Sequence, residues 1–588
     1  MCIRDRNTSR VITTGDFYAE PQIRIYQDTT LLSGAGEINL SSGVNNGSKA
    51  LTLGDSEQTG SIFVGGLQVR HLEVGNGAFD VTLDGAMHLA TNLAQPTKFL
   101  NTGSLTLKGQ GSSFFGGVEA LSVSQTNIAG CVATFGGDIN LSNVTMLDST
   151  YTNRFDTRWT QTQGGTAGGG DITISNFDTG NLNATKFVEF DIGNGTPDTV
   201  LLTGNIVSNN ELRFKGNGSV DVTGEANLAG SVRALDLSHE PNTTPSLNFT
   251  GNVTLTGPME FEGTSATFTN GVEGSDNDLT LDFSQTATVD GYSNIANFTS
   301  EGAVNLSGNF TTTGFQKYEG NVALGGNTEL VATTVEFADG ITGNLKNLTL
   351  SPSDSFIKLD GIQLSGVENL TIDGDLNLSG NLSAGDIDIQ GDTTLIGDAN
   401  LTSEIVSCLS SLQITLNGTV DGGHALTVNG GTTFDGEIGG TTPLASLTTE
   451  GGDTSLGGNV TTTGNQSFGS DVTLTGDTKF VAGSNVGLNG LVGGGYNVEI
   501  DAGSAAIDAE THSVSGIAAL TVPSDVGLNG VIATTGDQSY GGEVVLQGDT
   551  TLTAKTGAIS LGTGGEVAGA SHTLTLGDAN QTGDVTLS

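Results

Sequence analysis

Two clusters of carboxylates have the spacing that could carry chemistry. They are Asp276, Asp278 and Asp282 in the first cluster and Asp386, Asp388 and Asp392 in the second. Converging carboxylates act as general acid and base in enzymes that cleave glycosidic bonds. A site for acidic sugars also needs Lys or Arg, and neither cluster has a basic residue beside it. We therefore expect these side chains to cap turns and line strand faces, and we predict no enzymatic activity.

Metal and cofactor sites have little support in the sequence. Residues 373–377 (DGDLN) begin like an EF-hand loop, but the Gly and the twelfth-position Glu of that loop are missing. His424 and His572 precede equivalent Leu-Thr segments, and Ser48 stands at the same place in a third copy. A position that accepts Ser indicates a turn. We predict no cofactor, and at most weak Ca²⁺ binding by the acidic surface.

One irregular stretch, 148–171, is the candidate recognition element. Strand-like alternation lapses there, and Gly-rich segments follow, so we predict a loop insertion that leaves the regular fold. An exposed aromatic side chain beside Arg is typical of recognition surfaces. The candidate residues, which include the only Trp of the chain, are Tyr151, Arg154, Arg158 and Trp159. An ordinary insertion that covers the fold laterally is the alternative.

The amino-acid composition limits the classes of partner that the chain can be expected to bind. The chain has 588 residues, 90 of them Gly, and only 14% charged residues, with a formal net charge of −45. So low a charged fraction is not typical of charge-driven disorder. Nucleic acids and anionic membranes bind through basic patches, so neither is an expected partner. We find no apolar run of 18 residues, so we expect no membrane insertion by a helix.

Internal repeats set the expected architecture. A Thr-Thr-Gly motif starts at Thr13, Thr312, Thr462 and Thr534, and an Asp or Asn follows each Gly after 13 positions. The copies start 299, 150 and 72 positions apart, close to four, two and one times a unit of 72–75 residues. We predict one continuous repeat region over 7–588. Residues 1–6 resemble nothing that follows, and we expect them to be a non-native leader to an interior fragment.

Within each repeat unit, the sequence pattern predicts short strands separated by turns. Segments of the form Val/Ile-x-Leu recur, such as 38–40, 253–255 and 472–474, and Gly with Asp, Asn or Ser follows most of them. Period-two alternation buries the aliphatic side chains on one face, and Gly supplies the turns. We predict an all-β parallel β-helix, an elongated rod whose stacked Val, Ile and Leu fill a narrow core without large aromatics. A tandem array of β-sandwiches is the alternative.

Several segments resemble the passenger repeats of filamentous-haemagglutinin-like adhesins. They are 420–428 (VDGGHALTV), 438–448 (IGGTTPLASLT), 461–468 (TTTGNQSF) and 471–478 (DVTLTGDT). The resemblance is clearest over 414–588 and 11–70. It implies a right-handed β-helix, export by an autotransporter or two-partner route through an outer-membrane transporter, and display on or release from a bacterial surface. The implied partners are glycans or proteins of host cells or biofilm.

Two other functions stay open beside the structural adhesin. One is a β-helix carbohydrate-active enzyme, a polysaccharide lyase or hydrolase, which turnover of acidic or neutral polysaccharides would reveal. The other is a threonine-array binder of the ice-binding kind. Such an array needs Thr-x-Thr in every coil, whereas the Thr runs here recur once in 72–75 residues.

Overall fold

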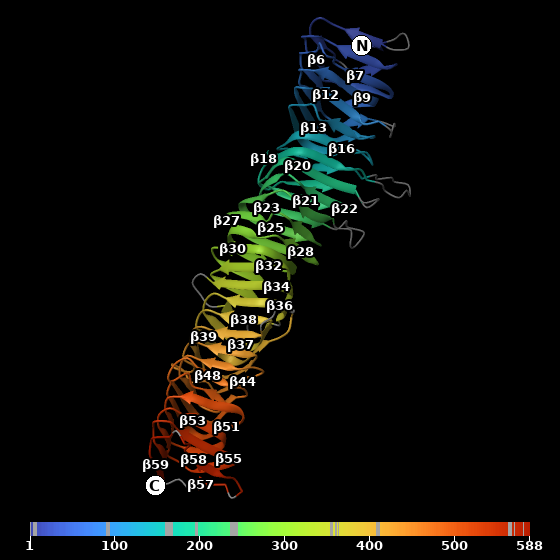
Figure 1. Ribbon diagram of the computed structural model, residues 1–588. Helices are drawn as coiled ribbons and strands as arrows, with labels where there is room; N and C mark the ends of the chain where they lie inside the picture. The colour runs from blue at the N-terminus through green and yellow to red at the C-terminus, as the bar shows by residue number, and fades with distance from the viewer. Residues whose placement is uncertain are drawn as a thin grey trace. The chain divides into compact units, whose positions relative to one another are not determined.

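The described part of the chain consists of short β-strands joined by turns, and it contains no α-helix (Figure 1). The chain divides into two compact units, Met1–Val304 and Asn305–Ser588, called unit 1 and unit 2. Among the described residues, no helix is long and apolar enough to cross a membrane. This computed structural model describes residues 2–3, 9–20, 22–89, 95–158, 169–193, 198–235, 245–352, 357–358, 362, 364–406, 412–562, 567–569, 571–579 and 581–587.

Parallel pairing between successive coils organises each unit. In unit 1, Val81 pairs with Ile62 of the preceding coil and with Leu105 of the following one. In unit 2, Ser455 pairs with Thr433 and Thr473 in the same way. The strands concerned are β8 (Ile62–Val64), β10 (Val81–Asp84), β13 (Ser104–Phe114), β43 (Gly431–Phe434), β45 (Thr454–Leu456) and β48 (Val472–Leu474). The predicted parallel β-solenoid is confirmed, and antiparallel sandwiches are excluded.

The core of each coil is made by every second residue. Strand β15 (Gln125–Ala133) alternates strictly between buried and partly exposed side chains. Most buried positions carry Val, Ile or Leu, as predicted. Aromatic side chains also stack inside unit 1, contrary to the expectation of an aliphatic core. The centroid of the Phe190 ring lies 5.1 Å from that of Phe155 and 4.9 Å from that of Phe214, and the rings of each pair are stacked and nearly parallel. Stacking of rings in successive coils makes this arrangement favourable.

The Thr-Thr-Gly motif is explained by a buried glutamine two residues after the Gly. Gln316, Gln466 and Gln538 are fully buried. In each case, the amide Nε2 donates to the backbone carbonyl six residues earlier and to the one fifteen residues later. These glutamines satisfy carbonyls at a corner of the coil, where the regular ladder is interrupted. They lie in β31 (Phe315–Tyr318), β47 (Gln466–Phe468) and β54 (Gln538–Tyr540).

An aromatic residue two positions after the glutamine completes the motif. The hydroxyls of Tyr318 and Tyr540 donate to the Oε1 atoms of their glutamines at 3.0 and 3.1 Å. The N-terminal copy departs from this pattern, because Tyr18 follows its Gly by three positions instead of four. A shift by one residue turns a strand side chain to the other face. Tyr18 is accordingly 62% exposed, and its hydroxyl donates to Glu37. It is not equivalent to the buried aromatics of the other copies.

Phe468 occupies the tyrosine position of its copy, and the Oε1 atom of Gln466 has no hydrogen-bond donor within the described structure. Phe468→Tyr supplies the missing hydroxyl, so we expect unit 2 to gain about 1 kcal/mol of unfolding free energy. Tyr540→Phe creates the same deficit at Gln538 and is expected to cost about 1–2 kcal/mol. Urea unfolding followed by circular dichroism measures both. Shifts of the same sign for the two substitutions would contradict the role of the hydroxyl.

Candidate functional site

The predicted recognition stretch begins inside the solenoid. Residues Asn153–Asp156 form strand β17, which pairs with β15 and with β19 (Phe187–Asp191). The prediction that all of 148–171 leaves the fold is therefore wrong for this segment. Its side chains alternate, with Phe155 in the core and Arg154 on the outer side, as a coil strand requires. Trp159 lies outside the described residues.

The aromatic stack of the core determines which charged side chains lie on the outer surface over it. Phe155, Phe190 and Phe214 point inward from β17, β19 and β21 (Glu211–Lys215). The residues on either side of each Phe then face outward. Arg154 comes into register with Glu189, and Asp191 with Lys215. Charges that are far apart in the sequence thus meet on one surface of unit 1.

We call the innermost six charged residues the ion cluster: Arg154, Asp156, Arg158, Glu189, Asp191 and Lys215. The Arg158 guanidinium joins Asp156 at 2.7 Å and Asp191 at 2.9 Å. The Arg154 guanidinium joins Asp156 at 2.6 Å and Glu189 at 3.3 Å, and the Lys215 ammonium joins Glu189 at 2.8 Å. Three cations and three carboxylates balance. The carboxylates are almost completely buried, whereas each cation keeps about 30% of its side chain exposed.

Further ion pairs continue along the next strands. Arg213 pairs with Glu211 at 2.8 Å, and its guanidinium lies 3.6 Å over the ring of Phe187. Arg233, in β23 (Glu225–Leu235), pairs with Glu260 and Glu262 of β25 (Val253–Gly263), each at 3.1 Å. The hydrogen bond from Arg213 lowers the pKa of Glu211. The carboxylates of these pairs are more exposed than those of the ion cluster, so salt screens these pairs more.

Burial dominates the electrostatics of the ion cluster. It raises the pKa of Asp191 from 3.8 to about 6, and the nearby Arg158 only partly offsets it. Burial also raises the pKa of the Cys131 thiol, which lies beside Arg154 in the adjacent strand. A thiol with a raised pKa is a poor nucleophile near neutral pH. Burial therefore keeps the Cys131 thiol protonated and weakly nucleophilic near neutral pH.

A depression of about 370 Å³ adjoins the cluster. It is lined by Cys131, Thr150, Tyr151, Thr152 and Arg154. Tyr151 is 41% exposed, so its aromatic side chain reaches solvent in the depression that Arg154 also lines. Of the four candidate residues, the structure thus brings Tyr151 and Arg154 to one depression and ties Arg158 into the adjoining ion pairs. A planar cation and an aromatic face together suit a polar ligand such as a sugar or an acidic side chain.

The acidic half of this site was not predicted from the sequence. Asp156, Glu189, Asp191 and Glu211 were not candidates, because no two of them are close in the sequence except within one strand. The usable signal is the alternation of charges with apolar residues in 187–191 (FVEFD) and 211–215 (ELRFK). Opposite charges on the outward positions of consecutive coils predict ion pairs between them.

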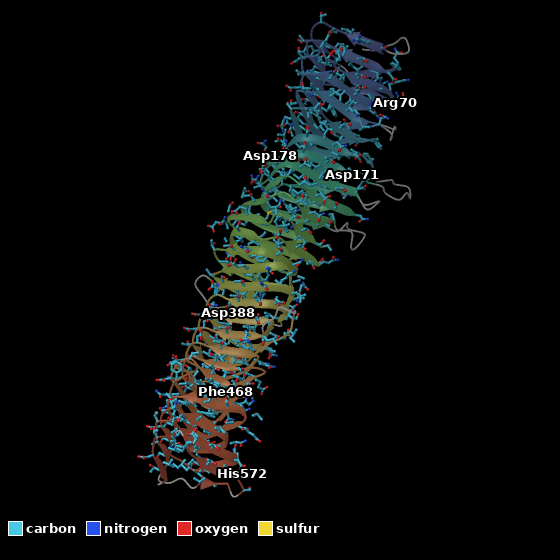
Figure 2. All side chains as sticks on the ribbon, in the orientation of Figure 1. Arg70, Asp171, Asp178, Asp388, Phe468 and His572 are labelled. Atoms are coloured by element: carbon cyan, nitrogen blue, oxygen red, sulfur yellow. The ribbon has the colours of Figure 1, made fainter. Side chains whose placement is uncertain are left out.

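The carboxylates that the sequence singled out do not converge on a site. Asp386 and Asp392 accept hydrogen bonds from the backbone N–H groups of Gln413 and Thr419, one coil further along. Asp278 accepts one from the N–H of Asn297 in the same way. Asp388, labelled in Figure 2, accepts from the side chain of Asn417. For these four aspartates, the bonds confirm the expectation that they cap turns and strand faces.

In the candidate calcium segment, 373–377, an aspartate also accepts a hydrogen bond from the backbone of a neighbouring coil. Asp375 accepts a hydrogen bond from the backbone N–H of Asp392 at 2.9 Å. Across the part of the chain that the structure describes, no three His, Cys, Asp or Glu side chains come together as a metal site. His424 and His572 lie in turns, as predicted.

Comparison with known proteins does not identify the chain. No protein-family model, curated protein or solved structure matches it.

Because the pKa of Asp191 is raised, we predict that this residue makes the stability of the fold depend on pH. Between pH 4 and pH 6 the folded state holds a proton that the unfolded chain has lost, so the contribution of Asp191 to stability falls as the pH rises through this window. Asp191→Asn has no such proton. We expect the variant to gain on the order of 2 kcal/mol relative to the wild type between pH 4 and pH 7.

Urea unfolding at four pH values measures this difference. Asp290→Asn is the matched control, since Asp290 is an exposed residue of unit 1 outside the ion cluster. A difference for Asp191→Asn that falls with rising pH would show instead that the carboxylate stabilises the fold.

Proposed function

We propose that the chain is a structural and adhesive passenger domain of a bacterial surface-exposed or secreted adhesin, similar to the filamentous-haemagglutinin-like proteins. It is exported through an outer-membrane transporter and has no catalytic role. The repeated parallel coils support a scaffold function, because each coil contacts only its neighbours and coils can be added without changing the fold. The receptor is a glycan or protein of a host cell or biofilm.

The single observation that carries this proposal is the use of polar side chains between coils. Asp171, labelled in Figure 2, accepts from the N–H of Thr199 at 2.8 Å. Asp477 and Asp549 bind the N–H groups of Asn497 and Thr573 at the same distance. Side chains that would serve as ligands or catalysts elsewhere hold one coil to the next here. This use suits a scaffold better than an enzyme.

The contact surface that we propose is the depression beside Tyr151 and Arg154. Affinity concentrates in a few aromatic and Arg anchors, and most outward positions of the coils carry Thr, Asn, Ser or Asp. At physiological ionic strength, repulsion from the acidic chain decays within about 8 Å, so a partner can approach this surface.

Tyr151→Ala tests the contact. Beads coated with the purified protein are counted on cultured epithelial cells and on biofilm matrix, and we expect retention to fall about tenfold, which corresponds to the loss of about 1.4 kcal/mol. Tyr496→Ala is the matched control, because Tyr496 is an exposed tyrosine of unit 2. Wild-type beads retained no better than albumin-coated beads would remove the adhesive function. Equal losses for the two variants would remove this contact surface.

The ion cluster favours one second candidate, a carbohydrate-active enzyme. Asp156 and Asp191 share Arg158, and the pKa of Asp191 is raised to about 6, a range suited to a general acid. Incubation with polygalacturonate and with neutral glucans tests this candidate. New reducing ends or unsaturated products that disappear in Asp191→Asn would establish catalysis, and no turnover by the wild type would exclude it for these substrates.

A further inference from the structure

We propose that the ion cluster of unit 1 is a binding site for the sulfate or carboxylate groups of acidic glycans, and that protonation of Asp191 opens it. This inference does not depend on the adhesive role, since the site can bind a glycan whether or not the chain attaches cells. An anionic ligand is not what the net charge of −45 would predict for this chain, because like charges repel.

The first support is the concentration of cations. Five of the 19 Lys and Arg residues of the chain come together on consecutive strands of unit 1. They are Arg154, Arg158, Arg213, Lys215 and Arg233. Each remains roughly one third exposed. A guanidinium binds oxyanions through two parallel N–H groups, so this surface has the right donors.

The second support is the distribution of burial within the cluster. The carboxylates lie beneath, with the Asp191 side chain 1% exposed, and the cations reach solvent. A ligand arriving from solvent therefore meets cations first. At neutral pH, Asp156, Glu189 and Asp191 neutralise Arg154, Arg158 and Lys215, and no net charge attracts an anion.

Asp191 is the carboxylate that can change this balance. Among the described elements packed around it, Asp156 and Arg158 face it from the β17 side, Lys215 from β21, and Glu189 from its own strand. When Asp191 takes up a proton from solvent, the carboxylate becomes a neutral acid and its charge-assisted bond to Arg158 weakens. The cluster then carries one net positive charge. Burial of this carboxyl supports titration near pH 6.

The depression gives the glycan a place to lie. Arg154 belongs both to the cluster and to the wall of the depression, next to Tyr151. A sugar ring can stack on the tyrosine while its anionic group contacts the guanidinium. The site thus distinguishes an acidic sugar from a free inorganic anion by using both contacts.

Fluorescence polarisation with labelled tetrasaccharides tests the proposal at 0.15 M salt. The probes are a heparin fragment for sulfate, a galacturonate oligomer for carboxylate and a dextran oligomer as the neutral control. We expect the wild type to bind at least one acidic probe about tenfold more tightly at pH 5.5 than at pH 7.5, and the dextran at neither pH. Asp191→Asn should bind that probe tightly at both pH values.

Matched variants separate this site from general charge effects. Asp290→Asn removes one exposed charge of unit 1 and should bind as the wild type does. Arg158→Gln should abolish the acid-induced binding, whereas Arg70→Gln, at an exposed ion pair with Asp28, should not. If Asp191→Asn fails to fold, the comparison of Arg158→Gln with Arg70→Gln decides the outcome. Unchanged binding in Arg158→Gln, or pH-independent binding by the wild type, would overturn the proposal.

Discussion

Parallel hydrogen bonding between successive coils is the constraint on which the rest of the structure depends. Backbone groups at Val81 are satisfied only by the coils before and after it, at Ile62 and Leu105. Because successive side chains of a strand alternate between its two faces, each strand contributes every second side chain to the core and leaves the others outside. The outward residues are then free to vary, provided that the backbone groups at the corners between strands find hydrogen-bond partners.

Those corners account for the unusual composition. Buried glutamines such as Gln466 satisfy backbone carbonyls within a coil and across to the next one. Asp and Asn accept from N–H groups one coil further, as Asp477 does from Asn497. A short carboxylate is well suited to this position because it accepts without donating. Much of the acidic excess is therefore structural, and the net charge of the chain is a poor guide to what its surface binds.

The ion cluster is the exception to this use of polar groups. Its carboxylates are bound by side-chain cations more than by backbone N–H groups, and they are buried, which is costly unless the charges are paired. Its position depends on the stack of Phe155, Phe190 and Phe214 beneath it, because stacked rings hold the outward neighbours in register. Core packing and surface chemistry are coupled there, so a substitution in the stack would also displace the charges above it.

The sequence by itself determined the class of the fold. Period-two alternation, Gly-containing turns and the recurring Thr-Thr-Gly motif predict stacked strands, and that signal is local, so it can be read without coordinates. It also indicated that the clustered aspartates close turns. Only the tertiary structure decided which charges meet. Arg154 bonds Glu189, 35 positions away, whereas Phe187 pairs with Glu211 after a much shorter interval. Because coils differ in length, the register between them depends on three-dimensional packing and not on a fixed repeat.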